Sequence, residues 1–420
     1  RVVLEPRAIA DAAHPVSGEE LRRLPPVRGL PGQPPMPDLF ARDAARRRRL
    51  LVIDGFVPLR VMGAGYPRAR ALLNQADALG WAVTLYPFDP VGPGWTHTYN
   101  EIAPGIEVMN QHGPAGLHAF LQDRSGFYDV VLVSRPEHMR PLRAILDADP
   151  ALLAGARLVY DAEALFSARQ AQRAALDGTP IPPGEQAALL QDELSLLTGV
   201  DAVVAVTEHE AAVFRSHGAP VTVLSHPMRP RAGPGFAERR GFLFVGRLLE
   251  PGSPNHDGLC WFIQAVWPAI RAALPDAALA IVGAVRADTS DLSGPGITVV
   301  GPVSDLDPFY DAARVFVAPA RFAAGIPLKV LEAAEAGLPV LTTMLIAGQL
   351  DWTGEEIAAA DDPVSLAGLA AMLHGDPVRW ASMRDAAAAR LRRDHGADRF
   401  ASVLRDLLER DVAVAKRPSA

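Results

Sequence analysis

Two cations lie where predicted secondary-structure elements end or begin, a placement that suits an anionic ligand. Arg247 directly follows the apolar run GFLFVG (241–246), and Lys329 lies in the first turn of the helix predicted from IPLKVLEAAEAG (326–337). A guanidinium at the end of a parallel strand can bind a phosphate group through two hydrogen bonds. A lysine at a helix N-terminus meets the positive end of the helix dipole, so its position is unfavourable unless an anion lies nearby. Together the two charges predict a diphosphate site.

Simple ion pairs are the alternative explanation of these charges. Lys329 and Glu332 are three residues apart on one helical face, and Arg247 lies close in sequence to Glu250 and Asp257. A lysine that precedes a glutamate opposes the helix dipole, and such a pair contributes only about 0.2–0.5 kcal/mol. The sequence therefore favours the diphosphate site, and ion pairing stays open as the alternative for each residue.

A glycine-containing loop early in the chain is a second candidate for ligand binding. Gly63 and Gly65 follow the strand predicted at the start of VIDGFVPLRVMGAG (52–65) and precede a helix. Glycines let the main chain approach a ligand, and the amides of the following helix suit a phosphate or a sugar hydroxyl. The loop lacks a full G-x-G-x-x-G pattern, so a plain turn explains it equally well.

The sequence gives no convincing metal site. Asn255, His256 and Asp257 are adjacent, but one histidine and one carboxylate in a loop make a poor metal site, so we interpret them as solvated loop residues. Cys260 is the only cysteine and falls on the predicted apolar face of the next helix. We therefore expect no metal, no intrachain disulfide and no catalytic thiol, and a reducing, cytosolic setting.

Two carboxylates and one histidine complete the candidates. Asp161 and Glu163 follow a predicted strand, where they would either contact a substrate or, as is more common, cap the next helix. His226 stands out among the scattered histidines because it follows a strand near the predicted hinge.

Alternating strands and helices predict two doubly wound domains. Continuous apolar strands separated by helical segments are typical of a parallel sheet that is covered on both faces. In the predicted first domain, 48–230, the strands are LLVIDGF (50–56), WAVTLYPF (81–88), YDVVLV (128–133), ARLVY (156–160), DAVVAV (201–206) and PVTVLS (220–225). In the predicted second domain, 231–396, they are GFLFVG (241–246), ALAIVG (278–283), ITVVG (297–301), RVFVAP (314–319) and LPVLTT (338–343). A Pro/Arg-rich arm, 1–47, precedes them, and a C-terminal helix, 397–420, is expected to cross back to the first domain.

Composition excludes several classes of function. The chain of 420 residues has 41 basic and 48 acidic side chains and a net charge of −7, which argues against nucleic acid as the main partner. No apolar run is long enough to span a membrane. The basic run 46–49 is expected to be a solvated lead-in to the first strand, with contact to anionic lipid at the inner face of the membrane as the alternative. Because the chain begins with Arg1, we expect it to be processed or part of a longer protein.

Several motifs occur in an order that resembles a known family. The succession VGRLLE (245–250), PNHDGLCWF (254–262) and AGIPLKVLEAAEAGLPVLTT (324–343) resembles the nucleotide-binding domain of a family 4 (group 1) glycosyltransferase of the GT-B fold. The resemblance runs from about 241 to 410, and VYDAEALFSAR (159–169) resembles the acceptor-side domain of bacterial members. It implies two Rossmann-like domains that face an interdomain cleft.

The resemblance also implies residue roles. Arg247 and Lys329 would hold the donor's diphosphate, and Glu332 would accept hydrogen bonds from the ribose. Main-chain groups would surround the nucleotide sugar, at Gly63, Gly65, Gly246, Gly301, Val303, Gly325, Ile326, Pro327 and Leu328. The reaction implied is a retaining, metal-independent sugar transfer from a nucleotide-diphosphate sugar to a glycan or lipid-linked glycan, typical of bacterial surface polysaccharide synthesis.

Two departures from the family pattern leave other functions open. Ala324 occupies the position of the first of two glutamates that the family usually carries, and the usual lysine after the strand is replaced by the loop PGSPNHDG (251–258). A catalytically inactive GT-B binding module and a nucleotide-sugar epimerase are therefore the alternatives. The sequence identifies neither the donor sugar and base nor the acceptor.

Overall fold

The structure is a computed structural model, and it describes residues 48–410 apart from 60–61, 64, 90–94 and 111. The predicted N-terminal arm and residues 411–420 lie outside the described residues. Internal contacts divide the chain into two units. Unit 1 contains the described parts of Arg1–Ala164 and Ala401–Ala420 together with Gln191–Leu224, and unit 2 contains Leu165–Leu190 and Ser225–Phe400.

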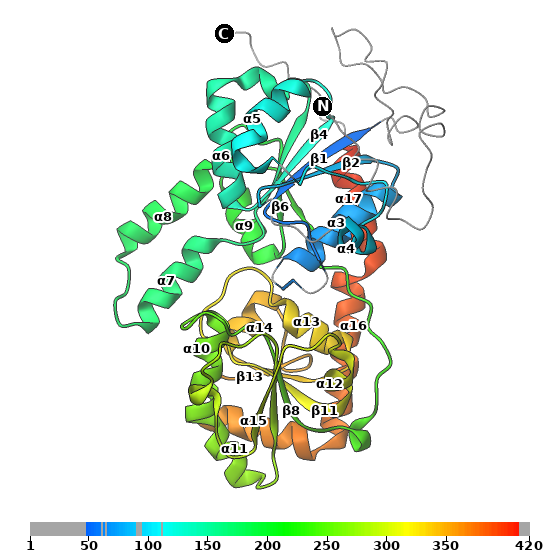
Figure 1. The fold of residues 1–420 in the computed structure, drawn as a ribbon. Coiled ribbons are helices and arrows are strands. Elements are labelled where there is room, and N and C mark those ends of the chain that lie inside the picture. The colour runs from blue at the N-terminus through cyan, green and yellow to red at the C-terminus, as the bar shows by residue number, and fades with distance from the viewer. Residues whose placement is uncertain (1–47, 60–61, 64, 90–94, 111, 411–420) are drawn as a thin grey trace. The chain divides into compact units, whose positions relative to one another are not determined.

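Unit 1 is built around a parallel sheet of seven strands in the order β3-β2-β1-β4-β5-β6-β7 (Figure 1). Its apolar runs form strands because both faces are covered, and Leu50, Leu51 and Ile53 of β1 are fully buried. The strands are β1 Arg49–Asp54, β2 Ala82–Pro87, β3 Glu107–Val108, β4 Val130–Ser134, β5 Arg157–Asp161, β6 Ala202–Ala205 and β7 Val221–Val223. The α-helices of unit 1 are α3 Tyr66–Ala78, α4 Trp95–Glu101, α5 Gly113–Asp123, α6 Pro136–Ala148 and α9 Glu208–Ser216. The helix α7 Phe166–Leu176 belongs to unit 2, and α8 Pro183–Ser195 begins in unit 2 and ends in unit 1.

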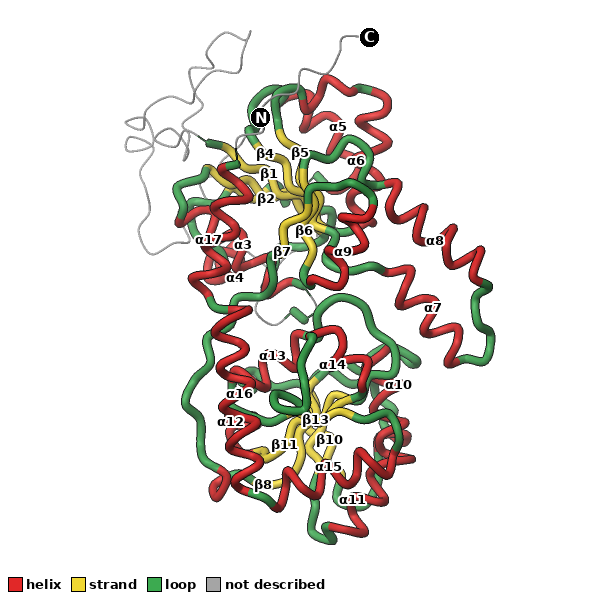
Figure 2. Tube along the Cα trace, turned by 180° about the vertical axis from the view of Figure 1, so that it is seen from behind, coloured by secondary structure: helices red, strands yellow, loops and turns green. Residues whose placement is uncertain are grey.

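Unit 2 contains a parallel sheet of six strands in the order β10-β9-β8-β11-β12-β13. Figure 2 shows the strands enclosed by helices. The strands are β8 Arg240–Val245, β9 Leu279–Val282, β10 Ile297–Gly301, β11 Ala313–Ala318, β12 Val340–Thr342 and β13 Ala358–Ala359. The helices are α10 Pro254–Trp261, a π-helix Phe262–Val266, α11 Trp267–Ala273, α12 Asp307–Ala312, α13 Leu328–Glu335, α14 Met344–Leu350, α15 Pro363–Gly375, α16 Pro377–His395 and α17 Ala397–Glu409, which continues into unit 1.

Alternation along β8 explains the two-sided packing of unit 2. Leu243 and Val245 pack in one buried cluster with α13 and α16, whereas Phe242 and Phe244 pack in another with α10, α11 and α15. Successive side chains of a strand point to opposite faces, so one apolar strand serves both clusters. The two parallel sheets confirm the predicted pair of Rossmann-like domains, and their arrangement about a cleft stays a prediction.

Each sheet has a point at which the order of strands reverses. It lies between β1 and β4 in unit 1 and between β8 and β11 in unit 2. Open α/β sheets bind ligands outside the carboxyl ends of the strands at such a point. Asp54 ends β1, Arg135 follows β4, and Arg247 follows β8 by two residues. Charged side chains therefore lie at the switch point of both sheets.

The last helix contributes to unit 1 from Ala401 onward. Arg157 at the start of β5 donates to the carbonyl of Leu407 at 2.9 Å, and Leu404 and Leu407 of α17 are buried. Within the part of the chain that the structure describes, no helix is both long and apolar enough to cross a membrane.

Gly258 allows α10 to approach the end of β11 closely, and its substitution tests this packing. A Cβ atom at 258 would lie 2.3 Å from the carbonyl oxygen of Pro319, so we expect Gly258→Ala to destabilise unit 2 by about 1–3 kcal/mol. Gly348 is an exposed glycine of helix α14 with open space around its Cα, and Gly348→Ala should stabilise by about 0.5–1 kcal/mol. Thermal unfolding of both variants measures the difference. Equal midpoints would show that the close approach does not exist.

Candidate functional site

Glycines end three neighbouring strands of unit 2. Gly246 follows β8 and donates to Val282 at 3.0 Å, and Gly283 follows β9 and donates to Gly301, the last residue of β10, at 2.9 Å. Gly283 has a φ of +131°, and a Cβ there would lie 2.1 Å from the carbonyl oxygen of Gly246, so no other residue fits. This edge of the sheet therefore offers main-chain groups to a ligand.

Arg247 extends from this edge into solvent. Its side chain is 70% exposed, and its nearest carboxylate, Glu250, is 4.0 Å away and 77% exposed. An ion pair with this geometry contributes little to stability. The other predicted partner, Asp257, is instead held by Arg321 through two hydrogen bonds of 2.9 and 2.6 Å. The guanidinium of Arg247 is therefore not fixed by an acidic neighbour.

Lys329 meets an amide rather than a carboxylate. It lies in the first turn of α13, where its ammonium donates to the side-chain oxygen of Asn255 and lies 4.8 Å from the ring centre of Phe244. The Asn255 nitrogen in turn donates to the carbonyl oxygen of Arg247 at 3.2 Å. Asn255 therefore connects Lys329 to the strand end that carries Arg247.

The charge of Lys329 is poorly compensated. Burial lowers the pKa of Lys329 to about 8, and the negative charge of Glu332 only partly opposes this shift. An amide oxygen stabilises an ammonium less than a carboxylate does, because it carries no net charge. A bound anion would restore the usual ionisation of the lysine.

The pKa of Glu332, which lies one turn after Lys329 on α13, is shifted in the opposite direction. Burial raises the pKa of Glu332 to about 7, the nearby Glu335 raises it further, and Lys329 lowers it. A half-buried carboxyl group with this pKa is available to accept hydrogen bonds from hydroxyl groups of a ligand.

The first turn of α13 has no side-chain cap. Its N-cap residue is Pro327, which makes no side-chain capping hydrogen bond, and its first turn has no acidic residue. The preceding Gly325 has a φ of +72°, which favours glycine. Ile326 and Leu328 pack their side chains against the core, as does Val303 after β10. The side chains of Ile326, Leu328 and Val303 are therefore turned away from a ligand at this sheet edge.

Unit 1 carries a cluster of buried charges at its own strand ends. Arg68 of α3 binds Asp161 at the end of β5 through hydrogen bonds of 2.7 and 3.0 Å. Arg135, after β4, binds Glu163 at 2.6 Å and Asp54 at 3.2 Å. The cluster thus joins the ends of β1, β4 and β5, and it spans the switch point of the sheet.

The cluster is strained and incompletely paired. Arg135 and Glu163 have positive φ angles of 71° and 56°, which are costly for residues other than glycine. Among the residues that the structure describes, the buried Oδ2 atom of Asp54 and Nη2 atom of Arg135 have no hydrogen-bond partner. Burial raises the pKa of Asp54 to about 7, although the charge of Arg135 acts in the opposite direction. Strain and unmet hydrogen bonds of this kind gather where proteins bind ligands.

The glycine loop of unit 1 adjoins this cluster. Gly65 is the N-cap of α3, and a Cβ atom at this position would lie 2.2 Å from a carboxylate oxygen of Glu163. The contact with Glu163 is thus sufficient reason for glycine at 65. Gly63 is exposed, and the intervening residue 64 lies outside the described residues.

Comparison with known proteins identifies the C-terminal part of the chain. Residues 239–376 match the family described as Glycosyl transferases group 1. These residues form a group 1 glycosyltransferase domain. The resemblance predicted from the motifs is therefore confirmed.

One curated relative and several solved structures agree with this assignment. An "Uncharacterized 44.6 kDa protein in cps region" of Klebsiella pneumoniae is 31% identical over 136 residues, which cover 30% of this chain and 34% of that protein. The alignment thus spans about a third of the relative's length. Among solved structures, a sucrose-phosphate synthase of Thermosynechococcus elongatus has a TM-score of 0.65 at 16% identity and covers 87% of this chain and 99% of that one. Anabaena Alr3699/HepE, in complex with UDP and glucose, has a TM-score of 0.63 at 13% identity and covers 87% of this chain and 100% of its own. At these identities the structures show a shared GT-B fold.

The structure brings together the residues predicted for the glycosyltransferase domain. Asn255 links Lys329 to Arg247, because it accepts from the Lys329 ammonium and donates to the Arg247 carbonyl. Glu332 lies on the same helix as Lys329. The predicted ion pair of Lys329 with Glu332 does not form, because the ammonium is directed to Asn255 instead. The roles of Gly246, Gly301 and the loop 325–328 in binding a nucleotide stay predictions.

Several interpretations from the sequence were wrong. Asn255, His256 and Asp257 are not solvated loop residues, because they lie in or beside the first turn of α10 and contact Lys329, Asp291 and Arg321 respectively. Asp161 and Glu163 do not cap α7, whose N-cap is Leu165, because both are held by arginines. His226 is buried near Ser225, which bonds His395.

Asp54 and Arg135 were not predicted as site residues from the sequence. Asp54 lies at the end of the apolar run in VIDGF, and Arg135 follows the apolar run that ends at VS in VSRPEH. A charged residue at the end of a predicted strand was the signal that could have identified each of them. The pairing of β1 with β4, which places them together, is a long-range feature that the individual motifs do not show.

The raised pKa of Glu332 predicts a pH-dependent gain in stability when the charge is removed. The folded protein binds this proton up to about pH 7 and the unfolded chain only up to about its ordinary value of 4.5, so ionisation of Glu332 reduces stability as pH rises through this window. We expect Glu332→Gln to raise the thermal midpoint at pH 8 by an amount equivalent to at least about 1 kcal/mol, and to have little effect at pH 5. The exposed Glu355→Gln is the control and should have no such pH dependence. An identical effect of Glu332→Gln at both pH values would contradict the assignment.

Proposed function

We propose that this chain transfers a sugar from a nucleotide-diphosphate sugar to a glycan acceptor. The observation that carries the proposal is the position of Lys329 and Arg247 at one edge of the group 1 domain, joined through Asn255 and without a firm carboxylate partner. Structures of Anabaena Alr3699/HepE with UDP, UDP and glucose, and UDP-glucose support a nucleotide sugar as the donor class.

The two cations would stabilise the leaving group. As the bond between the sugar and the diphosphate breaks, negative charge grows on the diphosphate oxygen, and preorganised positive charges lower the energy of that state. Arg247 and Lys329 would supply these charges, and the uncapped amides at the N-terminus of α13 would add their dipoles. Neither a metal nor a general base is required by this scheme, which the family resemblance implies to be a retaining transfer.

The remaining donor contacts follow from the same edge. Glu332 would accept hydrogen bonds from the ribose hydroxyls, because its carboxyl group lies one turn from Lys329 on α13. The main chain from Gly301 to Val303 would flank the base, since the side chain of Val303 is turned to the core.

The acceptor would bind to the charged cluster of unit 1. Asp54, Arg135 and Glu163 place carboxylate and guanidinium groups at the switch point of the sheet, where open α/β sheets bind ligands. The relative from a cps region supports a bacterial surface polysaccharide as the acceptor class.

An inactive binding module is the alternative that a specific residue favours. Ala324 cannot make the donor-sugar contacts of a carboxylate, so the chain would bind a nucleotide sugar without turning it over. A panel of UDP-, GDP-, ADP- and TDP-sugars, each with and without an acceptor, separates the possibilities. Transfer supports the proposal, a changed sugar without acceptor indicates an epimerase, and binding without any product indicates the inactive module.

Removal of either cation should slow turnover sharply. We expect Arg247→Ala and Lys329→Ala each to lower kcat by roughly 10²-fold, because each removes one preorganised group that stabilises the departing diphosphate. Arg240→Ala is the matched control, since Arg240 lies at the opposite end of the same strand, β8. The release of nucleoside diphosphate from the active donor measures the rate. Near-normal turnover by both variants, or an equal loss in Arg240→Ala, would defeat the assignment.

The pKa of Lys329 predicts how nucleotide affinity depends on pH. Without ligand the pKa is about 8, and a bound diphosphate raises it, so above pH 8 binding takes up a proton and affinity falls as pH rises. The fall should approach about tenfold per pH unit at most. An arginine keeps its charge throughout this range, so Lys329→Arg should bind with an affinity that changes little between pH 8 and about 9.5. Calorimetric titration gives both curves, and parallel slopes would show that Lys329 does not contact the anion.

A further inference from the structure

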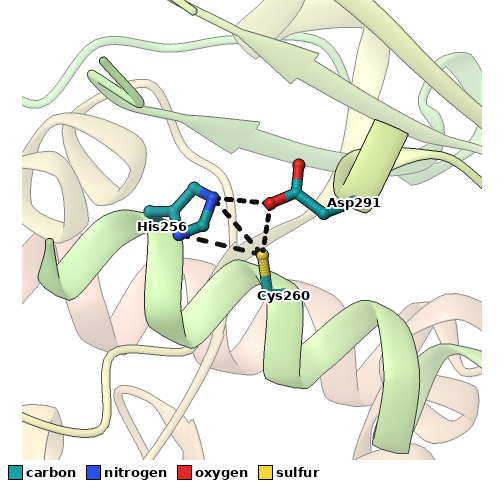
Figure 3. Close-up of side chains that lie close together, drawn as sticks. All are labelled: His256, Cys260 and Asp291. Carbon is teal, nitrogen blue, oxygen red and sulfur yellow. Dashed lines mark hydrogen bonds and ion pairs between the residues drawn. The ribbon is translucent and has the colours of Figure 1, made fainter. Parts of the chain in front are cut away.

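A second group of polar side chains in unit 2 has no part in the proposed reaction. His256 and Cys260 lie one turn apart on α10, and Asp291 lies in the 3₁₀ helix η4, Ser290–Leu292 (Figure 3). His256 Nε2 is 2.8 Å from Asp291 Oδ2, and Cys260 Sγ is 3.7 Å from each of these atoms. The three side chains converge on one point from two elements.

The three groups are an imidazole, a thiol and a carboxylate, which together are ligands typical of zinc. With ordinary bond lengths, the donor atoms around a tetrahedral zinc ion lie about 3.4–3.6 Å apart. The two distances from Cys260 Sγ, both 3.7 Å, already match this spacing. The distance between His256 and Asp291 is shorter because a hydrogen bond now joins them, and it would lengthen by about 0.6 Å.

The hydrogen bonds of Asp291 are unevenly distributed. Its Oδ2 atom accepts from His256 at 2.8 Å, from Arg286 at 2.5 Å and from Cys260 at 3.7 Å, whereas its Oδ1 atom is buried without a hydrogen-bond partner. Several positively polarised groups thus gather at one carboxylate oxygen, which is where a cation would be held.

We propose that His256, Cys260 and Asp291 bind a zinc-like divalent cation that ties α10 to η4. The thiol proton of Cys260 would pass to solvent and the resulting thiolate would bind the cation. The imidazole would bind through Nε2 with its proton moved to Nδ1, at the cost of the hydrogen bond of 3.2 Å that Nδ1 accepts from the amide of Gly252. A water molecule would take the fourth position.

The sequence prediction of no metal rested on two points that the structure changes. Cys260 packs against the apolar cluster as predicted, but it is only partly buried and its Sγ atom also lies 3.7 Å from His256 Nε2. Asp291 lies 31 residues after Cys260, so a local sequence motif does not include it. The proposed cation would connect α10 to η4 beside Asn255 and is separate from the sugar transfer, so its test does not depend on that function.

Cobalt titration of the full chain tests the proposal. Cobalt(II) replaces zinc with the same ligands, and a thiolate ligand gives a near-ultraviolet charge-transfer band. Because Cys260 is the only cysteine of the chain, such a band can come from this site alone. After treatment with a chelator and its removal, we expect the band to saturate at one cobalt ion per chain and to disappear when zinc is added.

Variants separate a metal site from a hydrogen-bonded cluster. Cys260→Ser should remove the band, and His256→Ala and Asp291→Asn should each weaken cobalt binding by at least about 10-fold. Arg286→Gln should strengthen binding several-fold, because it removes a cation that competes for Asp291. His209→Ala, at an exposed histidine of α9, is the control and should leave binding unchanged.

The wild-type protein decides the question even where a variant does not fold. Absence of the thiolate band at stoichiometric cobalt would overturn the proposal and leave a hydrogen-bonded cluster only. So would a band that survives Asp291→Asn and His256→Ala with unchanged affinity.

Discussion

A half-buried ammonium held by an amide is the interaction on which the proposed donor site depends. Lys329 is removed from water at the start of α13, its pKa falls to about 8, and its partner Asn255 carries no charge to compensate it. Isolated, this arrangement would cost stability, since a buried cation normally needs an anionic partner. In the proposed donor complex, the same position beside Arg247 would become favourable, because a diphosphate would supply the missing negative charge.

The charged cluster of unit 1 follows the same physical logic with different residues. Two arginines and three carboxylates are buried at the ends of β1, β4 and β5, and two of these residues adopt backbone angles that disfavour side chains. Burial raises the pKa of Asp54, and the charge of Glu163 raises it further, whereas Arg135 acts in the opposite direction. The rest of the unit must be rigid enough to maintain this strain, and the fully buried sheet provides that rigidity.

The sequence was sufficient for the features that depend on short segments. Apolar runs such as GFLFVG became strands because each is buried on both faces, and Arg247 and Lys329 were located because strand and helix ends are visible in the sequence. The partners of these residues were not predictable in this way. Asn255 reaches Lys329 over a separation of 74 residues, and Arg135 reaches Asp54 over 81, so their contacts exist only after the sheets have formed. For the same reason Asp291 was absent from any predicted metal site.

The most direct test of the central claim is the contribution of the second phosphate to binding. Calorimetric titration with UDP, GDP, ADP and TDP, each compared with its monophosphate, measures this contribution in the unmodified protein. If Arg247 and Lys329 bind a diphosphate, the preferred nucleoside diphosphate should bind at least about tenfold more tightly than its monophosphate. This difference should vanish in the double variant Arg247→Ala/Lys329→Ala. Equal affinity of the diphosphate and the monophosphate for the wild-type protein would contradict the account.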